Sequence, residues 1–413
     1  MTTDPPTTEL PVAGAPVAVL TAGGHDLCTP LGFTRSAPEG AAGLSWQGDR
    51  WAVGDRPLDA PLGAGEVAAL RPLRALHVGW PEEPSGDAMT TIVDLAGAGV
   101  PLTSGPAPSW VRDADPRLAD LVAGWAPELD GEMPAKPGSP AAAVSVADLR
   151  REEHSVRLRR HALRAKGLAR VLPSVTVVMA TRRPHFLRGA LEQMAAQRHV
   201  DLQVIVALHG VPLAEVREAV EGLPLPLTVL EEDARAPFGE VLNRAAARAE
   251  GDVLAKWDDD DWYGPEHLAD LLLARAYSGG DVVGMAQEFF YLEPLNVTIR
   301  RVDYSSEVWS DHVAGGTVLI GRELFHEVGG FGPNGPGEDA HLLRAVGAAG
   351  GSIYRTHGLG YVLRRSVGAE HTWQLPLAHF LRVAAHQWRG FRPSSILEGA
   401  RHSGGTRVIL EGS

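Results

Sequence analysis

A strand–helix–strand pattern runs through residues 175–210, VTVVMATRRPHFLRGALEQMAAQRHVDLQVIVALHG. Two apolar runs, at 175–180 and 202–208, have the length of buried strands, and a helix is predicted between them over 184–198. A further helix and a third strand, LTVLE at 227–231, continue the same alternation. This order of elements predicts an α/β fold with a mainly parallel sheet flanked by helices.

Polar residues follow each predicted strand of this sheet. Ligands of open α/β sheets bind at the carboxyl ends of the strands, so these residues are the first candidates for a site. They are Thr181-Arg182-Arg183, His209-Gly210, Glu232-Asp233 and the four aspartates 258–261.

The four aspartates follow the apolar strand DVLAKW, residues 252–257. Adjacent carboxylates repel one another and are costly to bury unless a cation neutralises them. Oxygen ligands suit Mg²⁺ or Mn²⁺, and either ion would also contact the phosphates of a bound nucleotide. An acidic turn before a helix beginning near Gly264-Pro265-Glu266 explains the same residues equally well.

Outside this region the chain divides by composition. Residues 1–130 predict a smaller α/β or α+β domain, with apolar runs at 16–22 and 75–80, a hairpin at 44–53 and a helix at 113–125, and we assign it no role. Residues 131–172 predict a linker followed by a basic helix, 146–169. Its apolar stripe at Leu149, Val156 and Leu163 suits a solvated connecting helix, although contact with an acidic partner or a membrane surface stays open. Residues 376–413 predict a helical extension and tail.

The overall charge excludes some partners. Acidic residues outnumber basic ones by 51 to 38, giving a net charge of −13, so a nucleic-acid partner is not expected.

A single cysteine, Cys28, permits no intramolecular disulfide, which favours a cytoplasmic protein. We see neither a signal peptide nor the roughly 20 apolar residues of a transmembrane helix, while peripheral membrane contact remains possible.

Four blocks of the sequence resemble the family 2 glycosyltransferases, which have the GT-A fold. In chain order they are VTVVMATRRP at 175–184, WDDDDWYGPEHL at 257–268, GGTVLIGRELFHEVGGF at 315–331 and GEDAHLLRAVGAAGG at 337–351. The resemblance implies a catalytic domain over 173–375. The DDDD run, the YLE at 291–293 and His371-Thr372-Trp373 further resemble a bacterial subgroup associated with surface or spore-coat glycans.

The resemblance implies an inverting transfer of a sugar from a nucleoside-diphosphate donor to a hydroxyl of a glycan, lipid-linked or small-molecule acceptor, with Mn²⁺ or Mg²⁺ as cofactor. Asp339, with Glu338 beside it, falls where the family has its catalytic base. The implied contacts to the nucleotide sugar are Thr181, Arg183, His209, Asp258 and Asp259. The implied metal ligands are Asp258, Asp260, Asp261 and His371.

Each role has a structural rival. Asp339 could only cap a helix, which is worth about 1 kcal/mol, and Arg183 and His371 could serve local packing. Adjacent Arg364 and Arg365 are more typical of a solvated face, and Trp257 and Trp262 of core packing.

The sequence also departs from the family pattern. His209-Gly210 stands where the family has a base-recognising aspartate, and His341 replaces a further aspartate. The processive Gln-x-x-Arg-Trp signature is absent. A catalytically degenerate nucleotide-sugar-binding protein is therefore the alternative. A nucleotidyltransferase is disfavoured, because the segment 180–189 lacks the glycines of a phosphate loop.

Overall fold

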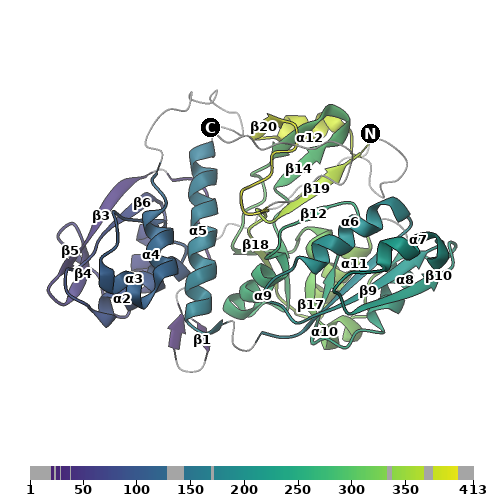
Figure 1. The fold of residues 1–413 in the computed structure, drawn as a ribbon, viewed down its shortest axis with the longest axis horizontal. Helices are drawn as coiled ribbons and strands as arrows, with labels where there is room; N and C mark the ends of the chain where they lie inside the picture. Colours follow the sequence, from purple (N-terminus) through teal and green to yellow (C-terminus); the bar gives the residue numbers. More distant parts are fainter. Residues whose placement is uncertain are drawn as a thin grey trace.

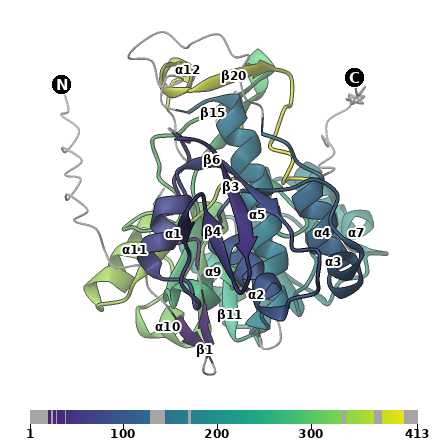
Figure 2. The same cartoon turned by 90° about the vertical axis from the view of Figure 1, so that its left-hand side faces the viewer.

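The computed structural model describes residues 20–22, 25–27, 29–37, 39–127, 144–168, 172–332, 337–366 and 375–398. In this part of the chain a small N-terminal unit and a larger body lie on either side of helix α5, Val146–Ala165 (Figure 1). Figure 2 looks onto the N-terminal unit, with its strands in purple. Within these ranges, no helix is both long and apolar enough to cross a membrane.

The larger body is built on an eight-stranded sheet, counted over the described ranges, in the order β10-β9-β8-β11-β17-β13-β18-β16. The first four of these strands are mutually parallel, β17 is antiparallel to both its neighbours, and β13 and β18 are again parallel. The predicted α/β class with a mainly parallel sheet is confirmed. The strands are β8 Val175–Thr181, β9 Leu202–His209, β10 Leu227–Glu232, β11 Val253–Lys256, β13 Val282–Met285, β16 Val308–Trp309, β17 Leu319–Gly321 and β18 Ile353–Thr356.

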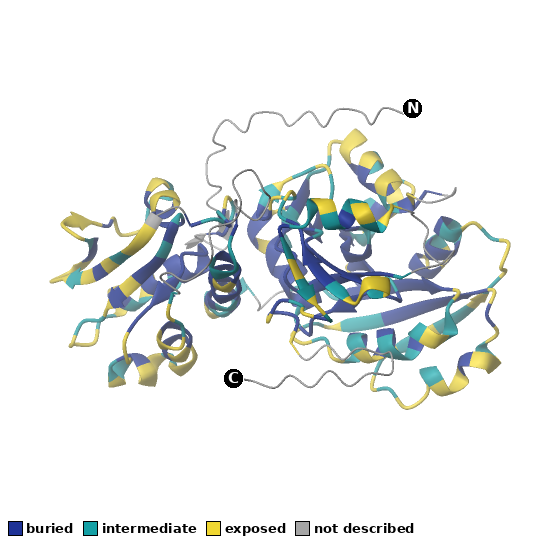
Figure 3. Ribbon diagram, turned by 90° about the horizontal axis from the view of Figure 1, so that it is seen from above, coloured by how far each residue is buried: buried dark blue, intermediate teal, exposed yellow. Residues whose placement is uncertain are grey.

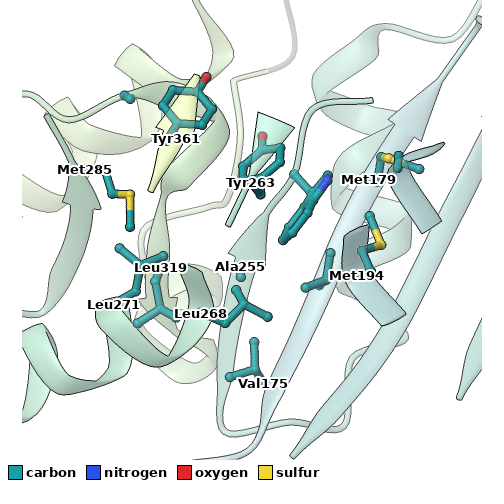
Figure 4. Close-up of a cluster of buried hydrophobic side chains, with 14 of the residues drawn as sticks. Val175, Met179, Met194, Ala255, Tyr263, Leu268, Leu271, Met285, Leu319 and Tyr361 are labelled. Carbon is teal, nitrogen blue, oxygen red and sulfur yellow. The ribbon is translucent and has the colours of Figure 1, made fainter. Parts of the chain in front are cut away.

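Strand β8 is buried on both faces, because alternate residues point to opposite sides of the sheet. Val175, Val177 and Met179 join one hydrophobic cluster, part of which is drawn in Figure 4. Val178 and Ala180 join a second cluster on the other face. The strands at the centre of this body are accordingly dark blue in Figure 3.

Helices supply the outer layers of both clusters. The first cluster includes side chains of α6 Pro184–Ala195, α7 Leu213–Val220 and α9 His267–Ser278. The second includes side chains of α8 Phe238–Ala246, α10 Arg322–Glu327 and α11 Glu338–Ala348.

A second sheet extends the larger body, in the order β12-β19-β14-β15-β20 among the described residues. Short 3-10 turns, η3 Glu293–Leu295 and η4 Gly315–Thr317, lie in the same body. Helix α12, Leu377–Val383, confirms the start of the predicted helical extension, but residues 386–389 form a strand instead, because they pair with β15. The strands are β12 Trp262–Tyr263, β14 Phe289–Leu292, β15 Val297–Arg300, β19 Tyr361–Arg365 and β20 His386–Arg389.

The N-terminal unit has its own sheet, β5-β4-β3-β6-β7, and its own hydrophobic cluster. The predicted hairpin is confirmed as β3 and β4. The helix predicted over 113–125 is instead two helices, because Asp115 is non-helical, with a φ of −151°, and caps a new helix that begins at Pro116. The strands are β1 Leu20–Ala22, β2 His25–Leu27, β3 Glu39–Gln47, β4 Arg50–Val53, β5 Arg56–Pro57, β6 Leu73–Gly79 and β7 Leu102–Thr103; the helices are α1 Ala64–Leu70, α2 Gly86–Gly97, α3 Ser109–Ala114 and α4 Pro116–Ala123.

Helix α5 is buried between the two bodies, so the prediction of a solvated connecting helix is wrong. Its apolar positions serve both sides: Leu158 belongs to the N-terminal cluster and Leu163 to the main one. Most of its charged residues are buried as well, and the buried ones meet an opposite charge or a polar group of the backbone. Arg160, for example, donates two hydrogen bonds of 2.7 Å to Asp270 of α9.

We expect Asp270→Ala to lower the free energy of unfolding by about 3–5 kcal/mol, because it leaves the buried Arg160 without its carboxylate. Urea denaturation measures the loss. Glu221→Ala is the matched control, since its pair with Arg217 is exposed and spans 4.0 Å, and we expect a change below about 0.5 kcal/mol. A loss under about 1 kcal/mol for Asp270→Ala would contradict the importance given to this interface.

Candidate active site

A cavity of about 840 Å³ opens where β8 and β11 end. The chain order of the sheet reverses between these two strands, since β9 and β10 lie on the far side of β8, and such a point leaves a crevice for a ligand. Side chains from several elements line the cavity: Arg182, Arg183, Phe238, Lys256, the aspartates 258–261, Gln287, His312, Glu338, Asp339, Tyr361 and Arg364.

Two of the four aspartates are held by Arg183, the first residue before α6. The Arg183 guanidinium pairs with Asp259 and donates to Asp260 Oδ2 at 2.8 Å. The Thr181 hydroxyl, at the end of β8, donates to the same Asp259 carboxylate. Burial raises the pKa of Asp259 to about 6 although Arg183 opposes the rise. Thr181 and Asp259 therefore fix the arginine at the mouth of the site.

Asp261 points toward the second sheet. Its carboxylate accepts hydrogen bonds from the Tyr361 hydroxyl and, at 2.8 Å, from the backbone N–H of Arg364. Burial, together with Asp260 and Asp258, raises the pKa of Asp261 well above its ordinary value. These two bonds tie the acidic run to β19 and compete with the metal contact predicted for Asp261.

Asp258 faces the opposite side of the cavity and meets a buried lysine. Lys256 Nζ lies 2.7 Å from Asp258 Oδ1, 3.3 Å from Asp339 Oδ1 and 3.7 Å from Glu338 Oε1. Burial alone would lower the pKa of Lys256, but the three carboxylates outweigh it and raise that pKa well above the ordinary value. The Lys256 ammonium group thus lies within ion-pair distance of Asp258 and of both predicted catalytic residues, Glu338 and Asp339.

Asp339 lies in the first turn of α11, where a carboxylate is favoured by the helix dipole. Burial raises its pKa to about 7; Lys256 opposes the rise and Glu338 and Asp258 add to it. Asp339 Oδ1 is buried and accepts no hydrogen bond. A buried carboxyl that titrates near neutrality is suited to taking up a proton.

The turn η4 brings its backbone close to both carboxylates. A Cβ on Gly315 would lie 2.0 Å from Asp339 Oδ2, and one on Gly316 would lie 2.6 Å from Asp258 Oδ2. Tyr263 fixes the same turn, because its hydroxyl donates to Gly316 O at 3.0 Å and accepts from Asp258 N at 2.9 Å. Only glycine leaves room for this approach.

His209, at the end of β9, is buried and does not line the cavity. Arg182 lies between His209 and the cavity. Its Nε is 3.0 Å from His209 Nδ1, and its Nη2 is 2.9 Å from Ala234 O. Burial and the Arg182 charge lower the pKa of His209, which favours the neutral ring. We find that His209 holds Arg182, and Arg182 faces the site.

Arg364 forms a further wall of the cavity. Its guanidinium pairs with Glu293 of the YLE sequence and lies 4.6 Å from the Phe186 ring centroid. Arg183 lies 5.2 Å from the same ring. The expectation that Arg364 lies on a solvated face is wrong, since it is buried and packed between aromatic rings. Arg365 is buried too.

Most of the predicted site residues are brought together. Those that line the one cavity are Arg183, Asp258, Asp259, Asp260, Asp261, Glu338 and Asp339. Trp257 and Trp262 are core residues as predicted, each at most 2% exposed. His371 lies outside the described residues. Among those that are described, no group of three or more His, Cys, Asp or Glu side chains is arranged to hold a metal ion.

Sequence reasoning missed Lys256, Gln287, His312 and the two glycines of η4 as parts of the site. A signal for Lys256 was present, because a lysine inside a buried strand requires acidic partners. Lys256 and Asp258 also stand two residues apart, which places them on one face of an extended chain. Gln287 and His312 carry no comparable signal.

Comparison with known proteins agrees with this geometry. Residues 174–314 match the model of the family described as glycosyl transferase family 2. This segment of the chain is therefore similar to the family 2 glycosyltransferases. The predicted GT-A type of α/β fold and the predicted transferase class are confirmed. None of the curated proteins compared with this chain matches it.

Solved structures show weaker likeness to this chain. One is a mannosyltransferase, PcManGT from Pyrobaculum calidifontis, in complex with GDP-Man and Mn²⁺, with 20% identity, a TM-score of 0.40, and coverage of 54% of this chain and 70% of that one. Another is S. aureus TarS 1–349 with UDP-GlcNAc, with 17% identity, a TM-score of 0.39, and coverage of 48% and 60%. Both structures resemble this chain only weakly.

We expect Gly315→Ala to displace the Asp339 carboxylate, because the new methyl group would overlap Oδ2. A displacement of about 1 Å can reduce catalysis by roughly 100-fold. A crystal structure and the rate of nucleoside diphosphate release check both effects. Gly347→Ala, in the same helix as Asp339 but with open space around the new Cβ, should leave both unchanged. An unmoved Asp339 in the Gly315 variant would contradict the prediction.

Proposed function

We propose that this protein is an inverting, metal-dependent glycosyltransferase that moves a sugar from a nucleoside-diphosphate donor to an acceptor hydroxyl. The acceptor class suggested by the sequence motifs is a cell-surface glycan or its lipid-linked precursor. One observation carries the proposal: the acidic run after β11 and the carboxylate pair at the start of α11 face the same cavity. Direct displacement needs one base on the acceptor side and charge stabilisation on the leaving-group side. The carboxylate pair would supply the base, and the acidic run would hold the cation that stabilises the leaving group.

Asp339 is the proposed base. As the acceptor oxygen attacks the anomeric carbon, its proton passes to the Asp339 carboxylate, whose Oδ1 accepts no hydrogen bond in the structure. The bond from the anomeric carbon to the diphosphate oxygen breaks on the opposite face. A covalent sugar–enzyme intermediate is not required.

The leaving diphosphate is proposed to meet the arginines of the cavity and a divalent metal ion. Arg183 and Arg364 both reach the cavity, and a guanidinium suits phosphate oxygens. The donor set for the metal is oxygen only, which fits Mg²⁺ or Mn²⁺ held by Asp258 and Asp260 together with donor phosphates. This arrangement is consistent with the lack of a three-residue metal cluster in the described ranges. When bound, the metal would stabilise the charge that develops on the leaving group.

The experiment that tests this proposal is calorimetric titration with UDP, GDP and dTDP, with and without Mn²⁺. We expect metal-dependent binding of one nucleotide, and Asp260→Ala to weaken it at least tenfold, or about 1.4 kcal/mol. Asp233→Ala is the control, because this exposed aspartate also follows a strand of the main sheet but lies outside the lining of the cavity. Absence of binding to every nucleotide would overturn the proposal, whereas binding without turnover would favour the degenerate binding protein.

The pH dependence tests the base. Asp339 must be ionised to accept a proton, and its pKa is raised to about 7, so kcat/KM should rise with pH and level off above about 7. Asp339→Asn should lower kcat by about 10²–10⁴-fold and remove this limb. Glu323→Gln, an exposed acid in the first turn of α10, should change neither. A variant Asp339→Asn with more than half of the original kcat would exclude Asp339 as the base.

A further inference from the structure

Lys256 is a charged residue in the middle of the main sheet. It ends β11, between β8 and β17, and its side chain is only 3% exposed. Its backbone N–H donates to Val318 O at 2.9 Å, so the residue is fixed by the sheet before its side chain meets any partner. The strand therefore fixes the position of the Lys256 ammonium group in the lining of the cavity.

The three carboxylates around Lys256 come from two separate parts of the chain. Asp258 follows β11 itself, while Glu338 and Asp339 open α11, about 80 positions later. One positive charge among three negative charges is a costly arrangement in a buried place, and removal of one partner of such a cluster costs more than its formation gains. Features that break the rules of core packing are expected at functional sites.

The choice of lysine is specific. The chain contains only three lysines, at 136, 166 and 256, against 35 arginines. The ion pairs of α5 and of the cavity mostly use arginine, whose guanidinium is a planar fork with fixed donor geometry. A lysine ammonium is compact and has three donors, so it can approach several carboxylates at once.

We propose that Lys256 is a positioning residue that sets the spacing between the donor-side carboxylate Asp258 and the base Asp339. The inference rests on the proposed function, since it assigns the two carboxylates to the two substrates. Lys256 acts through Asp339 and Asp258, and not directly on either substrate. The backbone of Gly315 lies close to Asp339 and that of Gly316 close to Asp258, so the turn η4 confines the same two carboxylates that the lysine contacts.

The first test replaces the ammonium with a neutral side chain of similar length, Lys256→Met. The probe is release of nucleoside diphosphate, with water as acceptor, from the sugar donor of whichever nucleotide binds in the calorimetric titration. We expect kcat to fall by about 100-fold, the lower end of the effect of losing a general base, while KM for the donor changes less than about threefold. Lys166→Met is the control, because Lys166 pairs with Asp94 in the N-terminal unit. It should keep the original kcat.

A double-mutant cycle separates positioning from general loss of structure. If Lys256 acts through Asp339, Lys256→Met combined with Asp339→Asn should be no slower than Asp339→Asn alone. Additive losses would overturn the proposal. The melting temperature of each variant shows whether it is folded, and Lys256→Gln, which keeps an amide donor, replaces the Met variant in the cycle if the latter does not fold.

A crystal structure of the Lys256 variant gives a result that does not depend on turnover. We expect the Asp339 and Asp258 carboxylates to move apart, whereas an unchanged spacing would overturn the positioning role. Failure of the proposed function gives a different pattern, in which the original protein binds no nucleotide and releases none. If the original protein is active and the Lys256→Met variant is fully active, the positioning role of Lys256 is wrong while the proposed function stands.

Discussion

Repulsion among adjacent carboxylates is the constraint on which this site depends. Four aspartates follow β11 in succession, and the surrounding fold divides them among three sets of partners. Asp258 meets Lys256, Asp259 and Asp260 meet Arg183, and Asp261 meets Tyr361 with a backbone N–H of β19. These partners lie on β11, directly before α6 and on β19. The contacts that offset the charges of the aspartates therefore also hold together the elements that line the cavity.

The part of this arrangement that depends on local pattern was predictable. Apolar runs separated by amphipathic helices predict the parallel sheet, and the strand-end rule places Arg183 and the aspartates at one edge. The motif at 337–351 adds Asp339, although nothing local shows that it faces the same cavity. The roles of these residues in binding and catalysis stay predictions.

What the sequence did not show depends on tertiary contacts. Helix α5 carries a dense row of charges, which is typical of solvent exposure. Most of those charges are buried instead, and their partners lie far along the chain, on α9, on β15 and in the segment before β16. The residues of β20 continue a helical pattern in the sequence, but they pair with the edge strand β15 and therefore form a strand. The link between His209 and Arg182 likewise requires knowing that two strand ends are adjacent.

The burial of α5 also bears on how the chain can vary. Arg159 reaches Glu307, Arg160 reaches Asp270 and Glu152 reaches Arg300, so one helix is joined to the catalytic body by charges of both signs. A substitution on either side of such a contact leaves an uncompensated ion on the other. Helix α5 is therefore not an exchangeable linker, because a helix of another sequence in its place would leave Glu307, Asp270 and Arg300 without these ion pairs.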